Sequence, residues 1–246
     1  MRVRVLLFGI LKEYLDTDTT SIELPDGATV ADLLEKLAAS ESIRHLENFA
    51  VSVNAEFAKA SQVLRDGDEV GMLPPVSGGT PSSVDIQGKT ANRHDNVVAF
   101  TRSPIPSGEI IAAAKRPEDG AVVVFDGIVR NETRGREVLH LDYESYEEMA
   151  LHQMQRLAEE AKERFAVRYA AIVHRLGRMK VGDTSVLIVV ASAHRAQAFD
   201  ACRWLIDTIK TTVPIWKRET FVDGASWADG EPFPAQVAIS PQSLEK

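Results

Sequence analysis

The 246-residue sequence has a single cysteine, Cys202, and no apolar stretch long enough to span a membrane. One cysteine excludes an internal disulfide framework and a cysteine-rich metal site, and it fits a reducing, cytoplasmic setting. The apolar run at residues 1–11 is interrupted by Arg2 and Arg4 and has no small-residue cleavage site. We therefore expect a strand there rather than a signal peptide or a membrane anchor.

The sequence also lacks a basic stripe. The net charge is −8, and residues 1–79 account for most of it, with 7 Lys and Arg against 13 Asp and Glu. A nucleic-acid-binding protein would carry clustered positive charge, so we expect no nucleic-acid partner. The acidic first segment instead suggests a carrier that docks on a locally basic face.

Residues 1–79 have the pattern of a small α+β domain. Thr29 is a plausible helix N-cap, and Asp32 suits the positive end of the helix that follows. Strands are expected at residues 3–8, 21–24, 51–53 and 69–73, and the apolar face of the helix is expected at Val30, Leu33, Leu34 and Leu37. This order predicts one helix packed across a mixed sheet.

The segment ends in Leu73-Pro74-Pro75-Val76-Ser77-Gly78-Gly79. A stiffened tail that ends in two glycines can enter a narrow cleft that any Cβ would block. The alternative is a flexible hinge, because glycine pairs are common in loops. Residues 80–95 are polar and lack an apolar period, so we expect a linker.

A second domain is expected at residues 96–246. Strands are predicted at residues 97–100, 120–131, 138–146, 168–176, 184–193 and 215–221, and helices at residues 108–114, 147–165 and 195–212. Ser107 is a candidate N-cap, and the chain beyond Gly224 is expected to be irregular. Cys202 falls on the apolar stripe of the last helix, so we interpret it as a packing residue.

Four short clusters place cationic or titratable side chains at the ends of these elements, where a rigid scaffold can hold them within reach of solvent. Taken singly, each has an ordinary structural explanation, such as a solvated loop arginine or a lysine that complements a helix end. The clusters are residues 125–131, 192–195, 210–214 and 216–219.

The first segment resembles the ubiquitin-like sulfur carriers of the β-grasp fold, and more closely the small subunit of molybdopterin synthase. The resemblance covers residues 1–79. It rests on Pro25-Asp26-Gly27-Ala28-Thr29-Val30, on Asp66-Gly67-Asp68-Glu69-Val70 and on the Gly-Gly end.

Residues 97–227 resemble the large subunit of molybdopterin synthase. The resemblance rests on the motifs Phe-x-Gly-x-Val-Arg, Ala-His-Arg, Lys-x-x-x-Pro and Trp-Lys-Arg-Glu. It implies an α/β hammerhead-type fold, a dimer of large subunits and a sulfurtransferase active in molybdenum cofactor biosynthesis. The terminal glycine, activated as a thiocarboxylate, would give sulfur to cyclic pyranopterin monophosphate to form the molybdopterin dithiolene.

The resemblance also implies site residues. Lys210 is the first candidate for the catalytic acid or base and Lys217 the second, with Gly79 as the residue that carries sulfur. An anionic, electron-rich pterin favours fixed cations and backbone donors, such as an arginine fork or a helix N-terminus. The substrate-binding set is Ile128, Val129, Arg130, His194, Arg195, Lys210, Lys217, Arg218 and Glu219, and no metal or cofactor is implied. Glu219 falls on the strand face of Lys217 and could orient it.

His194 and Lys210 lie 16 positions apart across one predicted helix, which separates them by about 24 Å. They cannot contact one small substrate from the same protomer. If both serve one site, His194 and Arg195 must come from a partner subunit. We therefore expect a homodimer through the second domain.

The fusion itself departs from the family, in which the small subunit ends at its last glycine. Here Gly79 is joined to Thr80, and an amide cannot be adenylated as a free carboxylate can. Either a protease cuts after Gly79, giving a heterotetramer-like assembly that an adenylating and sulfurating enzyme can charge, or a separate carrier serves the site. Two further alternatives are a non-catalytic ubiquitin-like module tethered to a docking scaffold and a sulfur carrier for another thiolation pathway.

Overall fold

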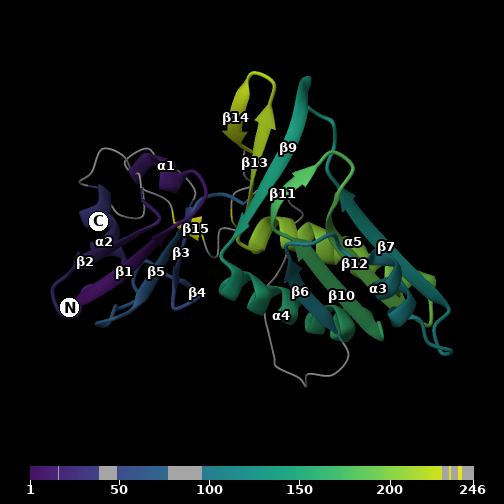
Figure 1. The fold of residues 1–246 in the computed structure, drawn as a ribbon. Coiled ribbons are helices and arrows are strands. Elements are labelled where there is room, and N and C mark those ends of the chain that lie inside the picture. Colours follow the sequence, from purple (N-terminus) through teal and green to yellow (C-terminus); the bar gives the residue numbers. More distant parts are fainter. Residues whose placement is uncertain (16, 39–48, 77–95, 229–232, 234–237, 240–246) are drawn as a thin grey trace. The chain divides into compact units, whose positions relative to one another are not determined.

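The computed structural model describes the chain apart from residues 16, 39–48, 77–95, 229–232, 234–237 and 240–246. The chain folds into two compact units (Figure 1). Unit 1 comprises residues 1–78 together with residues 229–246, and unit 2 comprises residues 79–228. The predicted Gly-Gly end and the predicted linker at residues 80–95 lie outside the described residues.

Unit 1 is built on a mixed sheet. Its elements are β1 (Arg2–Leu7), α1 (Leu11–Leu15), β2 (Thr19–Glu23), α2 (Val30–Ala38), β3 (Phe49–Val53), β4 (Glu56–Ala58), β5 (Glu69–Leu73) and β15 (Ala238–Ile239). The strand order is β15-β3-β5-β1-β2, and β4 also pairs with β3. β1 runs parallel to β5 and antiparallel to β2. This arrangement of one main helix on a mixed sheet is the predicted β-grasp fold.

Helix α2 supplies one side of the core of unit 1. Val30 and Leu33 are fully buried together with Val5 of β1. The helix begins as the sequence predicts, because the Thr29 hydroxyl accepts a 3.3 Å hydrogen bond from the Asp32 backbone N–H. The Thr29 backbone N–H donates in return to Asp32 Oδ2 at 2.6 Å. This reciprocal cap satisfies two donors that the helix end would otherwise leave unpaired.

The described residues of unit 2 form two sheets and three helices. Its elements are β6 (Val97–Thr101), α3 (Ser107–Ala114), β7 (Ala121–Ile128), β8 (Glu132–Thr133), β9 (Arg136–Ser145), α4 (Glu147–Phe165), β10 (Tyr169–Arg175), β11 (Gly177–Lys180), β12 (Thr184–Ser192), α5 (Arg195–Thr212), β13 (Ile215–Phe221) and β14 (Gly224–Trp227). One sheet has the order β6-β10-β12-β7. The other has the order β11-β9-β13-β14, with β8 paired to β9. The mixed α and β content agrees with the predicted fold class.

Helices cover both faces of the first of these sheets. On β10, Ala170 and Ile172 pack in the core that contains residues of α4 and α5. The alternate residues Ala171 and Val173 pack on the other face, where Ala114 of α3 is buried. Burial on both faces explains why this strand is a continuous apolar run in the sequence. Among the described helices, none is at once long and apolar enough to cross a membrane.

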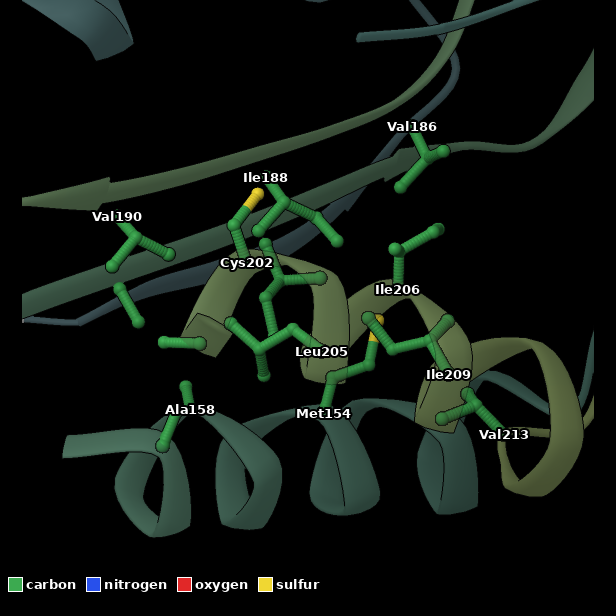
Figure 2. Close-up of a cluster of buried hydrophobic side chains, with 14 of the residues drawn as sticks. Met154, Ala158, Val186, Ile188, Val190, Cys202, Leu205, Ile206, Ile209 and Val213 are labelled. Carbon is green, nitrogen blue, oxygen red and sulfur yellow. The ribbon is translucent and has the colours of Figure 1, made fainter. Parts of the chain in front are cut away.

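Cys202 lies within this core, as the sequence predicts. Figure 2 shows its side chain beside Ile188, with Leu205 and Ile206 on the same helix. The cysteine is 5% exposed. Burial raises the pKa of its thiol to about 11, although a hydrogen bond with the backbone of Phe125 opposes the shift. A thiol in this state is a packing group rather than a nucleophile.

Three details differ from the sequence-based expectations. Ser107 is the first residue of α3 rather than its N-cap; Pro106 occupies the cap position, and no side chain caps the helix. The chain beyond Gly224 is not wholly irregular, since it forms β14 and β15. The short elements α1, β4, β8 and β11 had no periodic signal that distinguished them from loops.

The state of Cys202 can be tested with a thiol reagent. At pH 8 the native thiol is expected to react with an aromatic disulfide on the order of 100-fold more slowly than an unperturbed cysteine, because so little thiolate is present. The control is a Val222→Cys, Cys202→Ser double variant, which moves the thiol to a position that is 72% exposed. Equal rates for the two proteins would contradict the buried, high-pKa assignment.

Candidate active site

Lys217 and Glu219 form an ion pair on β13. Alternate residues of a strand project to the same face, so the two side chains lie next to each other. Lys217 Nζ is 3.4 Å from Glu219 Oε1, and the side chains are 23% and 6% exposed respectively. Glu219 Oε1 also accepts a 3.4 Å hydrogen bond from the Thr133 hydroxyl. A nearly buried carboxylate therefore holds an ammonium group that still reaches solvent, which is the contact expected from the sequence.

Tyr143 of β9 lies directly opposite Lys217 in the antiparallel pairing of β9 with β13. Opposite residues project to the same face of a sheet. Burial raises the pKa of Tyr143, and the negative charge of Glu219 raises it further. A hydrogen bond with Ser185 and the positive charge of Arg130 lower the pKa, but by less. The phenol is therefore neutral at physiological pH. Arg130 therefore lies close enough to Tyr143 for its charge to act on the phenol.

We refer to Lys217, Glu219, Thr133, Tyr143 and Arg130 as the β13 cluster. It combines two cations, one carboxylate and two hydroxyl groups. Such a set can bind an anion through the cations and donate hydrogen bonds to oxygen atoms of a substrate. It can also hold the lysine in a fixed position for proton transfer.

His174 packs behind Tyr143. The two rings meet edge to face with centroids 5.0 Å apart, and His174 is 6% exposed. Its Nδ1 lies 2.9 Å from the carbonyl oxygen of Arg175, so Nδ1 carries the proton and donates it to that oxygen. Burial lowers the pKa of His174 to about 4, although this hydrogen bond opposes the shift. The ring is a neutral support for the tyrosine.

Arg218 lies on the other face of β13 from Lys217, because neighbouring residues of a strand alternate. It is exposed and stands opposite Asp142 of β9. Asp142 is paired with the guanidinium of Arg178, with Nε 3.1 Å from Oδ1. The structure therefore does not bring Arg218 together with the β13 cluster within one protomer.

The end of β7 carries three of the predicted substrate-binding residues. Ile128 is 57% exposed and Arg130 is also exposed, whereas Val129 between them is 2% exposed. The Val129 backbone N–H donates to the Asp183 carbonyl at 3.0 Å, and its carbonyl accepts from Gly182 N–H at 2.9 Å. Val129 thus fixes the loop and leaves its two neighbours accessible.

Helix α5 separates the remaining predicted residues. His194 occupies its N-cap position without a side-chain capping hydrogen bond, and Arg195 is its first residue. Both are exposed, whereas Lys210 is partly buried in the last turn. The helix is continuous from Arg195 to Thr212, so His194 and Lys210 lie about 24 Å apart at its two ends. Gly79 lies outside the described residues.

Sequence reasoning missed Tyr143, Thr133 and His174. Tyr143 and His174 sit inside strands whose alternating or apolar pattern gave no sign of a polar role. Thr133 belongs to a two-residue strand. The pairing of strands distant in sequence places Tyr143 opposite Lys217, and contacts with Glu219 and Tyr143 then identify Thr133 and His174. One sequence without an alignment does not reveal that register.

Two family models match the chain in succession. Residues 5–79 match the model described as ThiS family, and residues 100–212 match the model described as MoaE protein. The first match ends at Gly79. The two matches account for the two expected domains in their order along the chain.

The relatives agree with the second of these matches. A molybdopterin synthase catalytic subunit from Pyrococcus abyssi is 44% identical over 123 residues, which is 50% of this chain and 83% of the relative. The human molybdopterin synthase catalytic subunit is 33% identical over 159 residues, which is 63% of this chain and 84% of the relative. A solved molybdopterin synthase from Staphylococcus aureus is 35% identical, with a TM-score of 0.50, and covers 57% of this chain and 99% of that chain.

The buried state of His174 predicts an acid-sensitive contribution to stability. The folded-state pKa is about 4, below the ordinary value of 6.5. The unfolded chain therefore takes up a proton first as pH falls below 6.5, and stability is lost from there down to about pH 4. Between pH 7 and pH 4.5 the loss from this side chain is about 2.5 kcal/mol in the free energy of unfolding.

Urea unfolding at both pH values measures this effect. His174→Asn keeps a donor for the Arg175 carbonyl but cannot titrate, so its loss of stability between the two pH values should be smaller by that amount. The control is His152→Asn, at an exposed position on α4. A pH dependence unchanged in His174→Asn would contradict the assignment.

Proposed function

The chain belongs to the molybdopterin synthase catalytic subunit family, with a ThiS-family segment ahead of it, and from this premise we propose that it is a molybdopterin synthase whose two parts are fused. The observation that carries the proposal is that the ThiS-family match ends at Gly79. A sulfur carrier and a sulfur-transferring enzyme therefore follow one another in one chain. That order favours the enzyme over a scaffold or a carrier for another pathway.

In the proposed reaction the Gly79 carboxylate is first adenylated and converted to a thiocarboxylate by a separate enzyme. The thiocarboxylate sulfur then attacks a side-chain carbon of cyclic pyranopterin monophosphate, the C–O bond at that carbon breaks, and its oxygen leaves protonated as water or stays on the phosphate. Hydrolysis of the resulting thioester leaves sulfur on the pterin and regenerates the carboxylate. Two such transfers build the dithiolene of molybdopterin. Because Cys202 is buried, with a thiol pKa raised to about 11, a persulfide on this chain is not part of the proposal.

The side chains take the following proposed roles. Lys210 transfers protons during sulfur attack and release. Lys217, oriented by Glu219, stabilises the negative charge that develops near the thiocarboxylate, and Tyr143 donates a hydrogen bond. Arg130 binds phosphate or pterin oxygens with its guanidinium fork, and Ile128 covers the pterin.

His194 and Arg195 complete the proposed site from a partner subunit. They lie at the far end of α5 from Lys210. At that end the helix has unpaired N–H groups and no acidic residue in its first turn, which favours a phosphate. A homodimer through unit 2 would bring the two ends of neighbouring helices to one substrate, and Arg218 would also act across that interface.

Release of the Gly79 carboxyl requires cleavage of the Gly79–Thr80 peptide bond. We propose that a protease cuts there. The carrier segment then comprises residues 1–79 and the catalytic segment residues 96–246, joined by residues 80–95 until the cut, although residues 229–246 of the second segment group with unit 1. The fragments would then form a heterotetramer-like assembly. The single cysteine favours the cytoplasm as its location.

The proposal is tested with chain cut after Gly79, thiocarboxylated at that residue and mixed with synthetic precursor. Formation of the dithiolene product is expected. Lys210→Ala should lower the turnover rate by on the order of 100-fold, since positioned acid or base groups contribute at least that much. The control is Lys115→Ala, which removes an exposed lysine beyond the end of α3. Full turnover by folded Lys210→Ala would contradict the role of the lysine, and no turnover by the wild type would contradict the function.

The shared site is tested by mixing variants. Lys210→Ala and His194→Ala homodimers should each be inactive. After their subunits are exchanged, half of the dimers should be mixed, and each mixed dimer should contain one intact site, so about a quarter of wild-type activity should return. Native mass spectrometry with one variant isotopically labelled confirms the exchange. No recovery in mixed dimers, or a fully active monomer, would rule out the shared site.

A further inference from the structure

The residues that follow unit 2 in the chain return to unit 1. β15 pairs antiparallel with β3, with Ala238 opposite Ala50 and Ile239 opposite Phe49 (Figure 1). Residues 79–228 are therefore flanked in the sequence by two parts of unit 1. We refer to the described residues of the second of these parts, Phe233 and β15, as the C-terminal strap. Neither family model includes it, since the matches end at Gly79 and residue 212. The sequence-based expectation assigned these residues to the second domain and did not foresee their pairing with unit 1.

Among the described residues of unit 1, β15 pairs with the part of the β3 edge that β4 does not reach. On one side, β3 pairs with β5 from Ala50 to Val53. On its other side, β4 pairs only with residues 51–53. An open strand edge presents unpaired N–H and C=O groups that another strand can use. β15 takes the place of such an added strand at Phe49 and Ala50.

A buried aromatic side chain fixes the strap. Phe233 is 3% exposed. Its ring meets the ring of Phe57 of β4 edge to face, with centroids 5.6 Å apart and planes at 73°. Backbone pairing gives a strap its affinity, and a buried aromatic anchor gives it a defined position. Two separate points of attachment therefore hold the strap on the carrier unit.

We propose that the C-terminal strap keeps the carrier unit bound after the chain is cut following Gly79. The inference rests on the proposed function, which requires that cut. Cleavage breaks one of the two chain connections between the units, but the second, at residues 228 and 229, stays intact. The strap remains covalently joined to unit 2 and non-covalently seated on unit 1. The freed glycine end is then kept at a high local concentration near its own catalytic unit.

The retention experiment uses the full chain with a specific protease site placed within residues 80–95. The chain is cut completely, and the dissociation constant of the two fragments is measured by dilution and native mass spectrometry. To exclude retention by the glycine tail itself, the same measurement is made on a chain that lacks residues 77–79. The two fragments are expected to remain associated in both forms.

Three variants test the strap. A chain that ends at Ala228 should release the carrier fragment. Phe233→Ala should raise the dissociation constant by on the order of 100-fold, because a buried phenylalanine is lost from the contact. Val222→Ala, which alters a 72% exposed residue in the turn between β13 and β14, is the control and should change nothing.

Hydrogen exchange provides an independent measure in the uncut protein. The peptide that contains Phe49 and Ala50 should exchange faster in Phe233→Ala and in the chain that ends at Ala228, while peptides of β1 and β5 stay unchanged and report an intact fold. If the wild type and the shortened chain retained the carrier fragment equally and exchanged amide hydrogens at equal rates, the proposed role of the strap would be wrong. Precursor turnover measured in parallel separates the two proposals. Turnover without strap-dependent retention of the carrier fragment contradicts only the role of the strap. Strap-dependent retention without turnover contradicts only the proposed function.

Discussion

The antiparallel register of β9 on β13 determines the chemistry available in unit 2. It places Tyr143 opposite Lys217 on the same face of the sheet, and the two-residue period of β13 adds Glu219 to that face. A slip of one residue would turn Lys217 to the other face and present Arg218 instead. The position of the neutral phenol opposite Lys217 depends on this pairing, whereas the ion pair of Lys217 with Glu219 depends on the two-residue period of β13 alone. His174, buried and uncharged behind Tyr143, keeps it in place.

Helix α5 imposes the second constraint, because it is long and continuous. Its buried stripe, which includes Cys202, fixes the helix against the sheet. His194 at its start and Lys210 in its last turn cannot approach one another without breaking that core. A site that uses both ends must be assembled from two copies of the chain. The same rigidity that defines the fold therefore favours an oligomeric enzyme.

Much of this arrangement could be predicted from the sequence, because the main elements have strong periodic signals. The cap at Thr29, the bounds of α4 and α5 and the contact of Lys217 with Glu219 follow from local rules of helix and strand geometry. The position of Tyr143 opposite Lys217 and the packing of Phe233 against Phe57 could not be predicted in this way. Both depend on pairing between residues far apart in sequence, which local propensity does not encode.

A freed Gly79 carboxyl is the central requirement of this account, since an amide at that residue cannot become a thiocarboxylate. The most direct measurement is the intact mass of the protein purified from its own cells under conditions that demand the cofactor. The account predicts a fragment of residues 1–79, part of it with one carboxyl oxygen replaced by sulfur, together with a fragment that begins at Thr80. Only the uncut 246-residue chain, in a preparation that converts precursor without a separate carrier, would contradict it.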